Sequence, residues 1–258
     1  MLQNLLTEKN KEKFENGILE VVEKTIKFIV SPNHIENSRS SQKVDGIHER
    51  ISQDLDFILG SDYMIRTKKT TGNEVNVKGA YVNKNVDIAI ERISDKKIVA
   101  VIEVKMHLSS ISKNLSNNFE NLLGQSANMR SVNIPFFQVS FLNAEAPVFS
   151  LTNDLKMETI NLKWVNRYLN LSFANSKDLK HVPDCTLIFA FNLLKSGGQC
   201  KNKRDYNRFI DESFLKKENS IQKYKLDQNL KFGPNVIFNE YLDFLVNVVN
   251  KIRGLKNE

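Results

Sequence analysis

The sequence predicts a mixed α/β fold of the α+β kind, in which helices flank a mixed β-sheet. Short apolar segments of strand length predict buried strands at residues 86–91, 98–105, 135–142 and 185–191. Longer segments with apolar residues at steps of three and four predict helices at about residues 8–30, 44–59, 112–130, 205–218 and 236–252. The order of these segments, with helices before, between and after the strands, is typical of a sheet covered by helices.

The segments between these elements are less regular. Residues 62–84 combine two strand-like pieces, "YMIRT" and "NVKGAYV", with several basic residues. Residues 194–207, "LKSGGQCKNKRDYN", read as a glycine-rich basic loop. We expect residues 1–258 to form a single domain, because a chain of 258 residues can bury one large core. In this interpretation residues 44–142 hold the central part of the fold, and residues 143–258 complete the sheet.

Charge and cysteine content narrow the classes of partner and compartment. The net charge of +7 favours nucleic acid or a membrane surface as partner, and a Lys-rich composition unrelated to binding explains it equally well. Two cysteines, Cys185 and Cys200, predict free thiols rather than a disulfide framework or a zinc site. No signal peptide or run of about 18 apolar residues is present. We therefore expect a cytoplasmic protein that does not enter a membrane.

Three charges interrupt the two apolar runs of the segment "VDIAIERISDKKIVAVIEVKMH" at residues 86–107. Asp87 falls in the first predicted strand, and Glu103 and Lys105 fall at the end of the second. The polar piece "ERISDKK" between the strands predicts an antiparallel hairpin. A turn centred on Asp95 places Asp87 opposite Glu103, with Lys105 on the same face as Glu103 because side chains alternate along a strand. The hairpin therefore predicts a cluster of the three charges.

Such a cluster has a chemical interpretation and a structural one. Two buried carboxylates repel each other, and a bound divalent cation removes that cost. Carboxylate oxygens suit the hard ions Mg²⁺ and Mn²⁺. A neighbouring lysine can orient or deprotonate water or stabilise charge on a phosphate, so the set predicts phosphodiester hydrolysis. The alternative is a structural salt bridge at a strand end.

The order helix, Asp strand, ExK strand, helix and further strand over residues 44–142 resembles the PD-(D/E)xK nuclease superfamily, which includes most type II restriction endonucleases. The resemblance implies a restriction-endonuclease-like sheet, with Asp87 and Glu103 as metal ligands and Lys105 as the catalytic lysine. The proline usual before the Asp is replaced by Val86. Glu49, in the preceding helix, matches the place of a supporting acidic ligand, and Gln125 matches a polar residue lining the site. Each is equally a solvated helix residue. His48 and His107 stand in no metal-ligand spacing.

Basic residues supply the expected DNA contacts. Two groups, before the Asp strand and in the glycine-rich loop, are candidates to contact phosphates: Lys68, Lys69, Lys78, Lys84, Lys201, Lys203 and Arg204. The alternative for each is a solvated surface charge.

The resemblance implies a Mg²⁺-dependent type II restriction endonuclease, with Mn²⁺ as a substitute, acting on double-stranded DNA as a homodimer. Residues 143–258 would then add DNA-binding or dimerisation elements. The alternatives are a less specific repair or defence nuclease and a catalytically silent DNA-binding protein of the same fold.

Overall fold

The computed structural model describes residues 7–31, 41–150, 152, 154–160, 162–226 and 230–254. Its helices are α2 (Glu8–Val30), the 3-10 turn η1 (Ser41–Val44), α4 (Asp45–Leu59), α5 (Lys68–Thr71), α6 (Ile111–Arg130), α7 (Leu162–Ser172), α8 (Lys203–Leu215) and α9 (Tyr241–Ile252). Its strands are β1 (Tyr63–Thr67), β2 (Val75–Lys78), β3 (Asn83–Val86), β4 (Ile88–Arg92), β5 (Lys97–His107), β6 (Phe136–Asn143), β7 (Glu145–Phe149), β8 (Leu155–Thr159), β9 (Cys185–Leu193), β10 (Ile221–Lys223) and β11 (Val236–Phe238).

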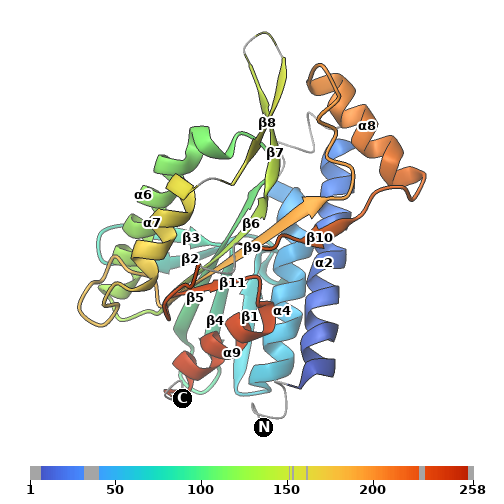
Figure 1. Cartoon of the computed structure of the whole chain (residues 1–258). Helices are drawn as coiled ribbons and strands as arrows, with labels where there is room; N and C mark the ends of the chain where they lie inside the picture. Colours follow the sequence, from blue (N-terminus) through green and yellow to red (C-terminus); the bar gives the residue numbers. More distant parts are fainter. Residues whose placement is uncertain are drawn as a thin grey trace.

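A mixed seven-stranded sheet forms the centre of the molecule, in the order β1-β4-β5-β6-β9-β10, with β11 also pairing with β9 (Figure 1). Strands β1, β4 and β5 are antiparallel to one another, whereas β5, β6 and β9 are parallel. Because β9, β10 and β11 belong to this sheet, residues after 142 complete it. The predicted fold class, a mixed sheet flanked by helices, is therefore confirmed.

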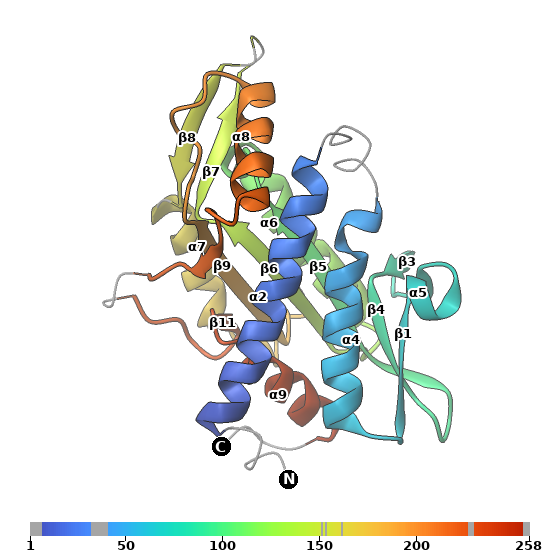
Figure 2. The same ribbon diagram turned by 90° about the vertical axis from the view of Figure 1, so that its right-hand side faces the viewer.

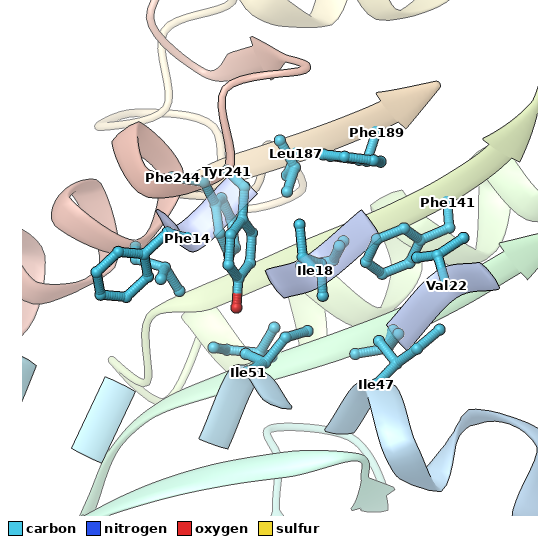
Figure 3. Packing of buried hydrophobic residues seen from close by; sticks show 14 of the residues in the cluster. Phe14, Ile18, Val22, Ile47, Ile51, Phe141, Leu187, Phe189, Tyr241 and Phe244 are labelled. Carbon is cyan, nitrogen blue, oxygen red and sulfur yellow. The ribbon is translucent and has the colours of Figure 1, made fainter. Parts of the chain in front are cut away.

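Helices cover both faces of the sheet, which lies between α6 and α7 on one side and α2 and α4 on the other (Figures 1 and 2). On the second side, apolar residues of α2, α4 and α9 pack on the sheet in one core, which Figure 3 shows around Ile18, Ile51, Phe141 and Tyr241. On the first side, Leu122 of α6 and Tyr168 of α7 belong to a second core. Successive side chains of a strand point to opposite faces of the sheet, so each strand contributes apolar residues to both cores.

The largest difference from the sequence prediction lies in the second half of the chain. Residues 143–184, for which no element was predicted, contain the β7–β8 hairpin and α7. The segment expected to begin a helix at residue 236 is instead the strand β11, because Val236–Phe238 pairs with β9 and Asn239 then takes a positive φ of 57°. The predicted loop 194–207 ends early, since Asn202 caps α8 by accepting a hydrogen bond from the backbone N of Asp205.

Candidate active site

Asp87 lies at the point where the chain changes sheets. Strand β3 pairs with β2 in a separate two-stranded sheet and ends at Val86, and β4 begins at Ile88 in the main sheet. The predicted hairpin register holds from Ile88, which pairs with Ile102, to Ile90, which pairs with Ala100. A bulge after Ile90 then shifts the register by one residue towards the turn. At the other end, the same register brings Asp87 beside Glu103.

The Asp87 carboxylate is fixed from one side only. Its Oδ2 accepts a hydrogen bond of 2.7 Å from the backbone N of Val104. Its Oδ1 lies 3.9 Å from Nε2 of His48, which is longer than a hydrogen bond. The Asp87 side chain retains 19% of its exposure, so the cluster opens to solvent here.

Glu103 is the most deeply buried member of the site, with a side chain only 3% exposed. Its Oε1 accepts a hydrogen bond of 2.6 Å from Nζ of Lys105 and a longer one of 3.4 Å from Nζ of Lys84. Its Oε2 is buried and has no hydrogen-bond partner among the described residues. Oε1 of Glu103 therefore accepts hydrogen bonds from two ammonium groups, while Oε2 is a buried acceptor that lacks a donor among the described residues.

Burial and mutual repulsion set the charge states of the cluster. Burial, reinforced by the negative charge of Glu103, raises the pKa of Asp87 from 3.8 to about 6. Burial acts to lower the pKa of Lys105, but the carboxylates of Glu103, Asp87 and Glu74 outweigh it and raise that pKa above 10.5. Lys105 is therefore a firmly protonated ammonium group at neutral pH. Its charge offsets part of the repulsion between the two carboxylates.

Glu74 is a member of this electrostatic cluster that the sequence reasoning missed. It is an exposed residue immediately before β2. Its negative charge raises the pKa values of both Asp87 and Lys105. In the sequence it stands in an irregular basic segment, and only the folding of β2 and β3 beside the main sheet brings it near the hairpin.

His48 is the second residue that the sequence reasoning set aside. It lies in the first turns of α4, its side chain is 9% exposed, and its Nε2 has no hydrogen-bond partner among the described residues. Burial lowers its pKa from 6.5 to about 4, so the ring is neutral at physiological pH and one nitrogen has a free lone pair. The signal was present in the sequence, because His48 follows Ile47 and precedes Ile51 on the apolar side of a helix.

The structure places Glu49 away from the cluster. Its Oε1 accepts hydrogen bonds from Nζ of Lys69 at 2.6 Å and from Nε2 of Gln53 at 3.3 Å. Glu49 also lines a groove between α2 and α4. Residues one apart on a helix point in different directions, and here the neighbour, His48, approaches Asp87.

Two further residues considered from the sequence, Gln125 and His107, lie on α6 and β5. Gln125 is half-buried on α6. His107 continues the row of Glu103 and Lys105 along β5, and its Nδ1 lies 3.4 Å from Nδ2 of Asn118. Burial and the charge of Lys105 lower the pKa of His107 to about 4, so this ring too is neutral.

The predicted basic residues divide into two groups on different parts of the molecule (Figure 2). Near the cluster, Lys84 contacts Glu103 and Lys69 is paired with Glu49, while Lys68 lies in α5 and Lys78 is exposed at the end of β2. The other group surrounds the start of α8, beside the β7–β8 hairpin. There Lys201 and Arg204 are exposed, and Nζ of Lys203 lies 5.9 Å from the ring centroid of Phe149.

Within the described part of the chain, no three His, Cys, Asp or Glu side chains form a group that could hold a metal ion. Nor does any described helix have the length and apolar character needed to cross a membrane. No family model, curated protein or solved structure matches the chain. The feature of this chain that indicates a function is therefore the chemistry of the cluster itself.

Proposed function

We propose that this chain is a metal-dependent DNA endonuclease of the type II restriction class, hydrolysing phosphodiester bonds in double-stranded DNA as a homodimer. The observation that carries the proposal is the meeting of Asp87, Glu103 and Lys105 at one end of the β4–β5 hairpin. A carboxylate that is 3% exposed and has an unpartnered oxygen destabilises a protein, unless a ligand supplies the missing interaction.

The residues of the cluster fit a hard divalent cation, Mg²⁺ or its substitute Mn²⁺. Mg²⁺ is commonly held by one or two protein carboxylates together with water and substrate phosphate, so Asp87 and Glu103 are a sufficient set. Nε2 of His48 has no hydrogen-bond partner among the described residues and lies 3.9 Å from Oδ1 of Asp87, but it does not complete a three-residue metal group with the two carboxylates. When bound, such a cation supplies a Lewis acid for the phosphate and lowers the pKa of the attacking water.

Lys105 would act as a charged donor rather than as a base. Its pKa is raised, so the ammonium group keeps its proton at neutral pH. Its Nζ already lies 2.6 Å from Glu103, which fixes its position on the exposed side of the cluster. From there it would donate a hydrogen bond to the phosphate oxygens and stabilise the charge that develops on them.

The basic residues would position the DNA. Lys68, Lys78 and Lys84 belong to the elements next to the cluster, and Lys201 and Arg204 lie near the start of α8. Lysine and arginine contacts to phosphates fix the register of a duplex without reading its sequence. The homodimer follows from the proposed class, since symmetric cutting of both strands requires two sites related by a two-fold axis.

Two other functions are consistent with the same fold. A less specific repair or defence nuclease would use the same residues, and a DNA-binding protein would use only the basic surface. The combination of an unpartnered Glu103 oxygen with a protonated Lys105 favours catalysis over binding alone.

The test is to incubate the purified protein with supercoiled plasmid in Mg²⁺, in Mn²⁺ and in chelator. Discrete fragments in the presence of a cation are the expected result. A smear would indicate the less specific nuclease, and binding without cutting would indicate a binding protein. Lys105→Ala should remove cutting, and Lys97→Ala is the matched control, because Lys97 is an exposed lysine at the other end of β5. Cutting that persists in chelator would exclude the proposed chemistry.

A further inference from the structure

Three buried polar side chains form a row across the middle of the sheet. Glu103 of β5 is the register partner of Gln138 of β6, and Gln138 is the register partner of Thr186 of β9. Paired residues on neighbouring strands point to the same side of a sheet. Here that side is the one covered by α6 and α7, because Val101 and Phe136, two residues earlier on β5 and β6, belong to the core on that side.

All three residues are almost completely buried, with exposed fractions of 3%, 3% and 0%. Each also has a buried oxygen that no described residue hydrogen-bonds: Oε2 of Glu103, Oε1 of Gln138 and Oγ1 of Thr186. The preceding pair in the same register, Val101 with Phe136, is apolar. Polar side chains in this row therefore weaken the metal-free fold, since apolar residues of similar size would leave no acceptor unmet.

The donors and acceptors of the three side chains allow a chain of hydrogen bonds that runs from Thr186 through Gln138 to Glu103. The Thr186 hydroxyl can donate to Gln138 Oε1, and the Gln138 amide can donate to Glu103 Oε2. Side chains of paired strand residues are close enough for such contacts, with Cβ atoms about 5 Å apart. The two hydrogen bonds would satisfy all three unpartnered oxygens at once and would end on the candidate metal ligand.

We propose that Gln138 is a positioning residue for Glu103, and that a hydrogen bond from the Thr186 hydroxyl in turn orients the Gln138 amide. This role rests on the proposed function. The Gln138 amide would donate a hydrogen bond to Oε2 of Glu103 and so fix the orientation of this carboxylate towards a cation. Residues that hold metal ligands in this way typically contribute 10- to 100-fold to metal affinity.

The proposal predicts opposite effects on two measured quantities. Gln138→Met keeps the length of the side chain and removes the amide, both its carbonyl oxygen and its NH2. It should raise the melting temperature of the metal-free protein, because a buried acceptor without a partner is removed. It should also weaken Mn²⁺ binding about 10- to 100-fold. A residue with a purely structural role would not move these two quantities in opposite directions.

The experiment titrates Mn²⁺ alone into the full-length chain and follows the free Mn²⁺ by electron paramagnetic resonance, with melting curves in chelator alongside. Gln222→Met is the matched control, because Gln222 is exposed on β10, and it should leave Mn²⁺ affinity unchanged. Thr186→Val should weaken binding less than Gln138→Met, and it tests the row independently if Gln138→Met does not fold. Excess Mn²⁺ should restore DNA cleavage by both variants.

The outcomes separate this role from the proposed function. If the wild-type chain binds Mn²⁺ and both variants bind it within twofold of wild type, Gln138 is not a positioning residue and the proposed function stands. If Gln138→Met lowers the melting temperature and Mn²⁺ affinity together, the row is structural. If the wild-type chain binds no Mn²⁺ and cuts no DNA, both proposals are wrong.

Discussion

Two buried carboxylate sites in this protein are equally buried but differ in how their oxygens are satisfied. Asp184, like Glu103, has a side chain 3% exposed. Its Oδ2 lies 2.9 Å from Nε of Arg130 and 3.0 Å from the backbone N of Phe136, and its Oδ1 lies 2.7 Å from Nζ of Lys251. Both Asp184 oxygens are therefore paired, whereas Glu103 Oε2 has no partner in the described chain. Unmet acceptors, rather than burial, distinguish the two sites.

The surroundings of Asp184 show what a structural carboxylate does. Arg130, at the end of α6, also donates to the backbone carbonyls of Leu179, Val182 and Ser176. The cluster thus ties α6, the segment after α7, the start of β6 and α9 together at one end of the sheet. Among the described residues at the hairpin end, Glu103 pairs with Lys105 of its own strand and with Lys84 of β3, which links fewer elements and is consistent with a role in binding.

Of the changes that test the difference between the Glu103 and Asp184 sites, we expect the largest effect from substitutions in the Asp87–Glu103–Lys105 cluster. Asp87→Asn and Lys105→Ala should each lower DNA cleavage by about a thousandfold or more, because one removes a proposed cation ligand and the other a charged donor to the phosphate. The measurement is the single-turnover cleavage rate at saturating protein. The melting temperature in chelator should stay the same or rise for Asp87→Asn, and it should fall for Lys105→Ala, because that change removes the ammonium partner of the buried Glu103. Cleavage near the wild-type rate by either variant would show that the residues are misassigned.

Asp184→Asn should lower the stability of the fold and leave DNA cleavage by the folded protein unchanged. Removing this charge leaves Arg130 and Lys251 without their buried partner, which costs about 3–5 kcal/mol of unfolding free energy. Urea unfolding monitored by circular dichroism measures the loss. The fraction that remains folded should cut DNA at the wild-type rate. A variant as stable as wild type would remove the distinction drawn between the two sites.

The third effect is a pH dependence of stability in chelator. The folded protein holds a proton on Asp87 up to about pH 6, whereas the unfolded chain releases it near 3.8, so wild-type stability falls as the pH rises between these values. Asn cannot ionise. The unfolding free energy of Asp87→Asn should therefore exceed that of wild type by a difference that grows to on the order of 3 kcal/mol by pH 7.

The two neutral histidines do not obscure this measurement. His48 and His107 have pKa values of about 4 in the fold, below their ordinary 6.5. Their contributions to stability are present above pH 6.5 and are lost as the pH falls towards 4, which is the opposite direction to Asp87. Because both histidines remain in the variant, their effects largely cancel in the difference. Parallel stability curves for the two proteins would contradict the raised pKa of Asp87.

The smallest effect concerns DNA affinity. Lys201→Ala and Arg204→Ala should each reduce the slope of log affinity against log salt by about 0.9, the value for one phosphate contact. Fluorescence anisotropy with a labelled duplex in Ca²⁺ provides the slopes. Lys97→Ala, an exposed lysine with no proposed DNA contact, should leave the slope unchanged. An unchanged slope in the first two variants would exclude the region around α8 from the DNA interface.

The hairpin was predictable from sequence because its information is local. Alternating apolar residues and a polar turn were sufficient to predict the pairing of Ile88 with Ile102, and so the meeting of Asp87 and Glu103. The position of His48 and the row through Gln138 depend on how distant segments pack, and a single helix or strand carries no signal of its neighbour's register. The small sheet of β2 and β3, which brings Glu74 and Lys84 to the cluster, was hidden for the same reason.

The contrast between local and distant pairing also has a consequence for the time course of folding. Strands β4 and β5 are joined by a tight turn, whereas β5, β6 and β9 are parallel and connected through long crossovers containing α6 and α7. Hairpins close in microseconds, and non-local parallel pairing is much slower. Trp164, the only tryptophan of the chain, is buried on α7 in the core that covers the parallel strands. We therefore expect its fluorescence to follow a late closure of this core, after the hairpin has brought Asp87 and Glu103 together.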